Sequence, residues 1–480
     1  MLRDLIREGG LYTLANFLTK GISLFLIPFY TAYFSPSDFG VIDMFTVFGF
    51  FITGVMTLQL SQGLARYVAE STLKRKERIE FASTAIWFSG LSLMAAFVLL
   101  TVLSSFFINV LFEPGTVDVE LYTLAVTSII VNAFFLFIGV YFRFIRMTTV
   151  FSLLSFLHAL FSILLTWLLV GYFKLGIESI YFSFLSVTPL LIITQLYLLR
   201  HRIKLTIKKD KIKKLLVYSL PLIPLTIATT VMNFTDRLFI KYYEGLDSLG
   251  IYAVGAKFSL IIAVVIGGFS MAIAPLVFQR HTDEQTKVEL KKIFYLFFSV
   301  GTMGFLTLSL FSKETLVILT NEHYYDANAV MPFMYFTAIF VGLNMFSHGL
   351  YIEKRTGIMA TITVIFASLN VLLNFILIPK YSIEGAAVAT LIATIGQHST
   401  LFLFSQKYYK IDLNYLKILI TAAICFGSVL LFKYFSFENY FIELVIKIAL
   451  IALFLIFLIR FDIFDYDRLR KFILRKLKVR

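Results

Sequence analysis

Charge, cysteine and enzyme motifs are scarce in this sequence, and each shortage excludes a class of protein. Only 15% of the 480 residues are charged, against about 25% in a typical soluble domain. Cys425 stands alone inside an apolar run, which excludes a disulfide framework and a thiolate metal site. The chain has neither an HExxH motif nor a glycine-rich phosphate-binding loop. We therefore expect a protein that is not an enzyme and that holds no cofactor or metal ion.

Apolar residues are abundant instead. They make up 59% of the chain, the mean hydropathy is +0.86, and nearly every window of about 20 residues is apolar enough to cross a bilayer. The sequence predicts an all-α, polytopic membrane protein with about 14 transmembrane helices. No small-residue cleavage site precedes the first apolar stretch, so we expect an uncleaved first span. The predicted spans are 10–34, 40–65, 81–112, 120–142, 150–173, 178–199, 215–240, 249–278, 293–312, 327–351, 357–378, 385–405, 416–432 and 441–459.

Lys and Arg alternate between the two sides of these spans. With the N-terminus placed inside, 34 of the 43 Lys and Arg fall on inner segments and only 5 on outer loops. Positively charged loops stay on the cytoplasmic side of a membrane. The formal net charge of +14 therefore reflects the membrane topology of the chain and does not indicate nucleic-acid binding. We expect both termini in the cytoplasm. The richest inner segments, 200–214 and the tail, are also expected to attract anionic lipid headgroups.

A shift of 210 residues brings several features of the chain into register. Gly40 in "DFGVIDMF" aligns with Gly250 in "SLGIYAVG", and Gly139 in "GVYFRFIR" aligns with Gly349 in "GLYIEKRT". An even number of spans gives both repeats the same orientation, so a pseudo-two-fold axis relating them would run along the membrane normal, as in transporters that work by alternating access. We expect an N-terminal six-helix lobe (1–200), a basic cytoplasmic linker (201–214), a C-terminal six-helix lobe (215–406), an appended helix pair (407–462) and a basic cytoplasmic tail (463–480).

Polar residues form a stripe in two corresponding spans, 10–34 and 215–240. They recur at spacings of three and four residues and so share one helical face in each span. The stripes comprise Thr13, Asn16, Lys20 and Ser23 in the first span and Thr226, Thr230, Asn233 and Arg237 in the second. A charge at the bilayer centre costs roughly 2.5–3.5 kcal/mol on insertion scales. A midspan lysine therefore needs a water-filled cavity or a carboxylate partner.

Other charged residues lie in or beside the spans. Asp43 is near the outer end of span 40–65, Arg66 is at its inner end, and Lys257 is in the outer third of span 249–278. Arg66 also fits an anchor at the membrane interface, and we expect Lys447, in the appended pair, to snorkel to the surface. Cations outnumber carboxylates within the spans. A pyrophosphate would offset their desolvation through charge-assisted hydrogen bonds, so an anionic cargo is favoured over a cationic drug.

Asp236 and Arg237 are adjacent in the stretch "NFTDRLFI". Neighbouring side chains on a helix point about 100° apart, so we expect these two not to pair with each other. Each should find a partner on a neighbouring helix. The resulting ion pairs would be either structural or part of a gate that breaks and re-forms as the lobes move.

Two stretches resemble a known family. "LYTLANFLTKGISLFLIPFY", followed by "GLARYVAE", is similar to the opening of Wzx-type polysaccharide transporters of the multidrug/oligosaccharidyl-lipid/polysaccharide exporter superfamily. "NFTDRLFI", followed by "SLGIYAVG", is similar to their seventh and eighth spans, in which an Asp-Arg pair and a Gly-Ile-Tyr recur. The resemblance implies a flippase for undecaprenyl-diphosphate-linked oligosaccharides, such as O-antigen (lipopolysaccharide) or capsule repeat units, in the bacterial cytoplasmic (inner) membrane. Many members have twelve spans, so the appended pair departs from the common pattern.

The resemblance and the polar stripes together suggest two sets of functional residues. The set expected to bind the substrate comprises Lys20, Lys257, Arg66 and Asn16, and the set expected to gate transport or couple it to an H⁺ or Na⁺ gradient comprises Asp236, Arg237, Asp43 and Asn233. The expected partners are the lipid-linked glycan, membrane lipids and polysaccharide-assembly proteins, and no nucleic acid.

Three alternatives remain open. An ion-coupled multidrug exporter of the same superfamily would need a cavity dominated by carboxylates. Related lipid II flippases also have fourteen spans, with a cationic cavity served by the helices that hold Lys20 and Lys257 here. A membrane glycan polymerase is less favoured, because it would need a long outer loop with basic or catalytic groups and the predicted loops are short.

Overall fold

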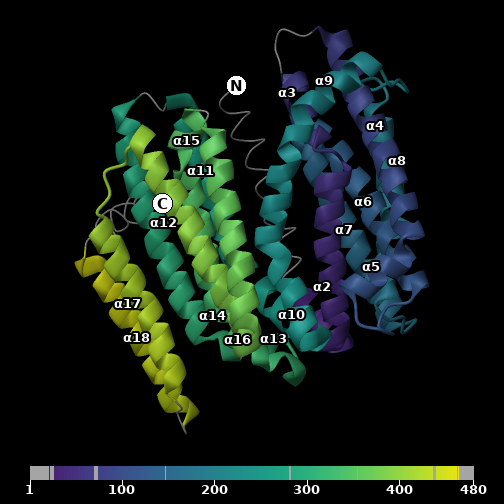
Figure 1. Ribbon diagram of the computed structural model, residues 1–480. Helices are drawn as coiled ribbons and strands as arrows, with labels where there is room; N and C mark the ends of the chain where they lie inside the picture. Colours follow the sequence, from purple (N-terminus) through teal and green to yellow (C-terminus); the bar gives the residue numbers. More distant parts are fainter. Residues whose placement is uncertain are drawn as a thin grey trace, which may run out of the picture. The chain divides into compact units, whose positions relative to one another are not determined.

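The computed structural model describes residue 21 and residues 26–69, 74–145, 147–280, 283–353, 355–435, 439–461 and 463. Within these residues every regular element is a helix (Figure 1), which confirms the all-α fold. The chain divides into two compact units. Unit 1 comprises Met1–Ala253 and Ala367–Ala386, and unit 2 comprises Val254–Phe366 and Ala387–Arg480. The division into two six-helix lobes with an appended pair stays a prediction.

Unit 1 is a bundle of long helices in which α6 packs against α4, α7 and α8. Its elements are α2 (Pro36–Phe51), the π-helix η1 (Ile52–Met56), α3 (Leu60–Ala69), α4 (Arg75–Val102), α5 (Ser104–Leu111), α6 (Val119–Phe144), α7 (Thr148–Gly171), α8 (Glu178–Leu199), α9 (Lys209–Ser219), the short 3₁₀ helix η2 (Leu220–Leu222), most of α10 (Ile223–Phe258) and the middle of α16 (Thr356–Tyr408).

Unit 2 is built around α12, which packs against α11, α14, α17 and α18. Its elements are α11 (Leu260–Arg280), α12 (Glu284–Leu310), α13 (Ser312–Leu319), the 3₁₀ helix η3 (Glu322–Ala329), α14 (Met331–Gly342), the 3₁₀ helix η4 (Leu343–Phe346), α15 (His348–Ile352), the two ends of α16, α17 (Tyr415–Tyr434) and α18 (Tyr440–Arg460).

Ten helical segments of the described residues are long and apolar enough to cross a membrane, and a bent pair, Glu322–Ala329 with Met331–Phe346, adds a further candidate. Two of the ten are of double length, Lys209–Ser270 with 62 residues and Thr356–Tyr408 with 53. Each contains a residue with strongly non-helical backbone angles, Gly245 in the first and Ser382 in the second, and each accounts for two predicted spans. Every predicted span from 40–65 onward thus has a helical counterpart, and the chain is a multi-pass membrane protein. Most of span 10–34 lies outside the described residues.

The predicted span 40–65 is broken, not continuous. The π-helix η1 widens its middle, and Leu58 and Gln59 follow with φ values of 53° and 50°, a left-handed conformation that is uncommon for residues with a Cβ. The Gln59 Nε2 donates to the Gly54 carbonyl oxygen at 2.9 Å. This bond satisfies a backbone acceptor that the broken helix would otherwise leave free inside the bilayer. The break separates α2 from α3.

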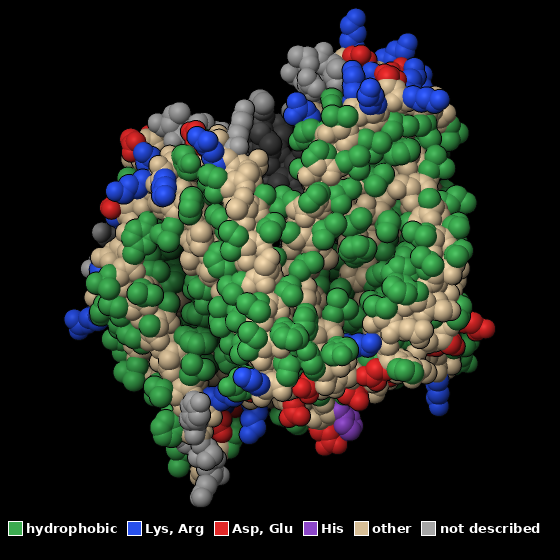
Figure 2. Space-filling model, viewed as in Figure 1, with side chains coloured by type: hydrophobic (Ala, Val, Ile, Leu, Met, Phe, Trp, Pro, Cys, Tyr) green, Lys and Arg blue, Asp and Glu red, His purple; other side chains and the backbone are tan. Residues whose placement is uncertain are grey.

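The basic end of unit 1, defined by residues 74–78 and 200–214, has a core of its own. Leu60, Leu64, Phe81 and Leu215 bring α3, α4 and α9 together there. Gly63 allows the close approach of α3 to α9, because an added Cβ would lie 2.7 Å from the Ser219 Oγ. Figure 2 shows Lys and Arg side chains gathered at this end, over α3 and α9, and hydrophobic side chains below them.

Candidate functional site

An ion pair joins two helices of unit 1. The Nε of Arg237 on α10 lies 3.3 Å from the Oδ2 of Asp43 on α2, and the two side chains are only 13% and 10% exposed. The sequence predicts that Arg237 finds its partner on a neighbouring helix, and this pairing is confirmed. The role of the pair in gating stays a prediction.

Asp236 and Arg237 also pair with each other, so the expectation that they do not is wrong. The Arg237 Nη1 donates to both carboxylate oxygens of Asp236 at 2.8 Å. The angle of about 100° between neighbouring side chains fixes only the direction in which each leaves the helix. The long arginine side chain folds back along α10, where Nη1 also donates to the Asn233 carbonyl oxygen at 3.0 Å. One guanidinium therefore bridges two carboxylates from two helices.

Tyr252 completes this group of residues. Its hydroxyl donates to the Oδ2 of Asp236, whose side chain is only 1% exposed. The Arg237 Cζ lies 5.2 Å from the centroid of the Tyr252 ring and 5.4 Å from that of Phe234, within the range of a cation–π contact. We call Asp43, Asp236, Arg237 and Tyr252 the charged cluster. Sequence reasoning missed Tyr252, although it lies in the Gly-Ile-Tyr stretch on which the family resemblance rests.

A turn at Gly245 makes this cluster possible. In a straight helix Asp236 and Tyr252 would be about 24 Å apart, so α10 must fold back between them. Gly245 has φ 86°, which suits glycine because it has no Cβ. The next amide, that of Leu246, donates to the Oε1 of Glu113 at 2.9 Å, and the Nζ of Lys241 donates to the Val110 carbonyl oxygen at 3.2 Å. The end of α5 and the residues after it therefore hold the turn in place.

Within the part of the chain that the structure describes, the cluster gathers the carboxylates of Asp43 and Asp236 around the guanidinium of Arg237. The hydroxyl of Tyr252 stabilises the more deeply buried carboxylate by a charge-assisted hydrogen bond. A buried ion pair contributes little net stability, but the loss of one partner is costly because it leaves an uncompensated charge. Chemically, the arrangement can hold α2 against α10, and its carboxylates are groups that can bind a proton or a cation.

The other predicted site residues are distributed differently. Asn233 contributes its backbone to the cluster, while its Nδ2 donates to the Thr229 carbonyl oxygen at 2.8 Å. Arg66 lies apart, at the basic end of unit 1, with its Cζ 4.9 Å from the Tyr218 ring centroid. Lys257 belongs to unit 2 and is partly buried near the end of α10. Asn16 and Lys20 lie outside the described residues.

Unit 2 contains a charged group that the sequence interpretation missed. Lys447 on α18 does not snorkel: it is 1% exposed, and its Nζ lies 2.5 Å from the Oε1 of Glu314 and 2.7 Å from the Oε1 of Glu443. The spacing of Glu443 and Lys447 is the usual helical pair of i and i+4. Glu314 comes from α13, far away in the sequence, and no local pattern pointed to it. Among the described residues, no cluster of three or more His, Cys, Asp or Glu could hold a metal ion.

Two family models match the chain. The model described as polysaccharide biosynthesis protein matches residues 5–281, and the MatE model matches residues 221–376. The first match covers more than half of the chain. It includes the charged cluster and every residue that the sequence analysis assigned to substrate binding or gating.

The chain is also similar to individual proteins and solved structures. The capsular polysaccharide biosynthesis protein CapF of Staphylococcus aureus is 25% identical over 211 residues, which are 42% of this chain and 51% of CapF, so the chain spans about half the length of this relative. The lipid II flippase MurJ, in an inward closed conformation, matches with a TM-score of 0.72 and 19% identity over 93% of this chain and 98% of MurJ. An inward-facing multidrug resistance MATE family transporter of the MOP superfamily matches with a TM-score of 0.69 and 12% identity, over 82% of this chain and 94% of that one. The family matches confirm the predicted resemblance, and the structures show a shared fold.

Proposed function

We propose that this chain, which belongs to the polysaccharide biosynthesis protein family, is a flippase that moves an undecaprenyl-diphosphate-linked oligosaccharide across the cytoplasmic membrane by alternating access. The observation that carries this proposal is the family match over residues 5–281, because that segment contains all the candidate site residues. The name of the CapF relative also favours a surface polysaccharide repeat unit as the cargo.

In this proposal the pyrophosphate of the cargo is held by Lys20 and Lys257. Arg66 assists at the inner mouth, and Asn16 also contributes to substrate binding. Lysine and arginine pay a desolvation penalty inside a membrane protein, and a pyrophosphate offsets it by charge-assisted hydrogen bonds. The charged cluster holds α2 against α10, and its carboxylates take up H⁺ or Na⁺ from a gradient as the transporter changes conformation. The concentration of Lys and Arg on one side of the predicted spans supports a cytoplasmic position for both termini.

The test is export of the surface glycan in cells that produce normal amounts of each variant. We expect Lys20→Ala and Lys257→Ala each to reduce export, and Lys257→Arg, which keeps the charge, to reduce it less. The control is Lys76→Ala, which removes an exposed lysine at the basic end of unit 1. Unchanged export in both alanine variants would overturn the assignment of these two lysines.

A second candidate is an ion-coupled multidrug exporter, and the MatE match over residues 221–376 is the observation that favours it. It predicts efflux of cationic dyes and drug resistance on expression, with no effect on the surface glycan. A lipid II flippase is a third candidate, supported by the shared fold of MurJ. It predicts that the chain sustains peptidoglycan synthesis in cells depleted of their own lipid II flippase.

A further inference from the structure

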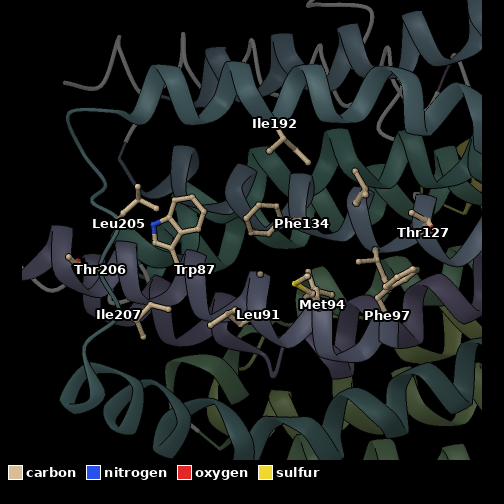
Figure 3. A pocket seen from close by; sticks show the side chains of 14 residues that line it. Trp87, Leu91, Met94, Phe97, Thr127, Phe134, Ile192, Leu205, Thr206 and Ile207 are labelled. Atoms are coloured by element: carbon tan, nitrogen blue, oxygen red, sulfur yellow. The ribbon is translucent and has the colours of Figure 1, made fainter. Parts of the chain in front are cut away.

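An apolar groove runs along one flank of unit 1, between α4, α6 and α8 (Figure 3). Its volume is about 760 Å³, which is within the range of sites that bind small molecules. Trp87, Met94 and Phe97 of α4 face Phe134 of α6 and Ile192 of α8 across it. Nearly all of the lining is hydrocarbon, so the groove fits an apolar chain and not a polar ligand.

The groove opens toward lipid. It follows α4, which is long and apolar enough to cross a membrane. Leu91 and Met94 in its wall are 54% and 66% exposed, and at this depth exposed side chains meet acyl chains instead of water. Lipid is therefore the material that reaches this surface.

The linker between α8 and α9 closes one end of the groove. Residues 204–208 are fixed to α4 by three hydrogen bonds: the Trp87 Nε1 donates to the Lys204 carbonyl oxygen at 2.9 Å, the Lys204 amide donates to the Ser83 Oγ at 2.8 Å, and the Lys208 amide donates to the Thr84 Oγ1 at 3.2 Å. Figure 3 shows Leu205, Thr206 and Ile207 at this end and Phe97 and Thr127 at the other.

This closed end is positively charged. Lys204 and Lys208 stand on either side of the three linker residues that line the groove. Lys208 is paired with Glu80 at 3.3 Å, whereas the exposed Lys204 ammonium has no ion pair within the part of the chain that the structure describes. Leu205 is 85% exposed, an apolar residue on a basic segment, as expected where a chain lies at the membrane interface. A cationic end on a hydrocarbon groove is complementary to an anionic amphiphile.

We propose that this groove binds an anionic glycerophospholipid, with one acyl chain along α4 from Leu205 to Phe97 and the headgroup phosphate at Lys204. From Trp87 to Phe97 the helix rises about 15 Å, so the chain would lie along the inner leaflet. Moving an acyl chain from the bilayer into the groove exchanges one hydrocarbon environment for another. Selectivity therefore comes from the headgroup, and bound lipid presses the linker onto α4 and stabilises the basic end of unit 1.

Fluorescence quenching tests this directly, because the chain has only two tryptophans and Trp87 lines the groove. In the Trp167→Phe variant, Trp87 is the sole emitter. The protein is reconstituted in phosphatidylcholine vesicles with rising fractions of dibrominated phosphatidylglycerol or, separately, dibrominated phosphatidylcholine. We expect the anionic lipid to reach half-maximal quenching at a mole fraction about fivefold lower than that of brominated phosphatidylcholine. A factor of this size corresponds to the attraction of one lysine near the membrane surface to an anionic headgroup. The Trp87→Phe variant reports from Trp167 on α7, outside the groove, and should show no such preference.

Matched variants separate a built site from general attraction to a basic surface. Lys204→Gln should remove the preference for phosphatidylglycerol, whereas Lys76→Gln, at an exposed lysine of the same end, should leave it unchanged. Met94→Phe narrows the groove and should weaken quenching by both lipids, whereas Val98→Phe, 55% exposed on the same helix but outside the groove, should not. Lys204→Gln changes an exposed side chain, so the test does not depend on the folding of Met94→Phe.

Three outcomes would overturn the proposal. Equal midpoints for the two brominated lipids at Trp87 would mean that bulk lipid fills the groove. Equal effects of Lys204→Gln and Lys76→Gln would mean diffuse surface attraction. Relief of quenching by undecaprenyl phosphate at a lower mole fraction than unlabelled phosphatidylglycerol would identify an isoprenoid chain as the occupant.

Discussion

Gly40 and Gly250 lie against each other where α2 meets the second half of α10. A Cβ added to Gly250 would lie 3.0 Å from the Gly40 backbone nitrogen and would overlap the Pro36 carbonyl oxygen. These are the two glycines that the 210-residue shift aligns. Residues related by a two-fold axis can touch only near that axis, so the predicted axis would pass beside this contact; the two-fold repeat itself stays a prediction.

The contact predicts that Gly250→Ala destabilises the protein. Replacing glycine by alanine inside a helix usually gains up to about 1 kcal/mol, but overpacking a filled site costs about 1–3 kcal/mol. Here the added Cβ meets backbone, which cannot rotate away. We expect a lower midpoint of thermal unfolding in detergent. Gly427→Ala in α17, where nothing lies within 4 Å of the added Cβ, is the control and should leave the midpoint unchanged or raise it; equal shifts would contradict the prediction.

Removing the hydroxyl of Tyr252 should weaken the charged cluster. A hydrogen bond to a charged group contributes about 1.5–3 kcal/mol, and Tyr252→Phe takes one from the buried Asp236. The matched control is Tyr181→Phe in the same unit, because the Tyr181 hydroxyl is buried and lacks a partner among the described residues. Thermal unfolding of the two variants should differ in sign, with Tyr252→Phe less stable and Tyr181→Phe unchanged or more stable. A midpoint for Tyr252→Phe at or above that of the unmodified chain would show that Asp236 does not depend on this donor.

Breaking the ion pair between Arg237 and Asp43 should lower the stability of the protein, and a second substitution should restore part of it. Arg237→Met removes the cation that pairs with the buried carboxylates of Asp43 and Asp236, and the loss of one partner of a buried pair costs about 3–5 kcal/mol. Combining it with Asp43→Asn removes one of those charges. We expect the double variant to be destabilised by less than the sum of the single variants, with a coupling of about 0.5–3 kcal/mol. Additive effects in a thermal unfolding cycle would mean that the two side chains do not interact in the membrane.

Periodicity and apolar length predicted the helical class, the spans from 40–65 onward and the partner of Arg237 on another helix. They did so because apolar length and helical spacing are local properties of a sequence. Three features escaped this reasoning. The pairing of Asp236 with Arg237 depends on the reach of one rotamer, the meeting of Tyr252 with Asp236 depends on the turn at Gly245, and the partnership of Lys447 with Glu314 depends on how α18 packs on unit 2. Each is set by tertiary contacts, which a local pattern does not contain.

Lys447 provides the sharpest test of the packing of unit 2. It is 1% exposed between Glu314 and Glu443, so Lys447→Met removes the cation that pairs with both carboxylates. We expect a loss of about 3–5 kcal/mol, the cost of breaking a buried pair, seen as a lower unfolding midpoint and faster proteolysis of the segment holding α17 and α18. Lys410→Met, at an exposed lysine of unit 2 outside the pocket that Glu443 and Lys447 line, is the control and should have little effect. Adding Glu314→Gln and Glu443→Gln to Lys447→Met should recover most of the lost stability, because a well-packed neutral group can replace a buried ionic one. A triple variant no more stable than Lys447→Met would contradict this expectation. It would show that packing of the lysine side-chain carbons, and not the charge, holds α18 in place.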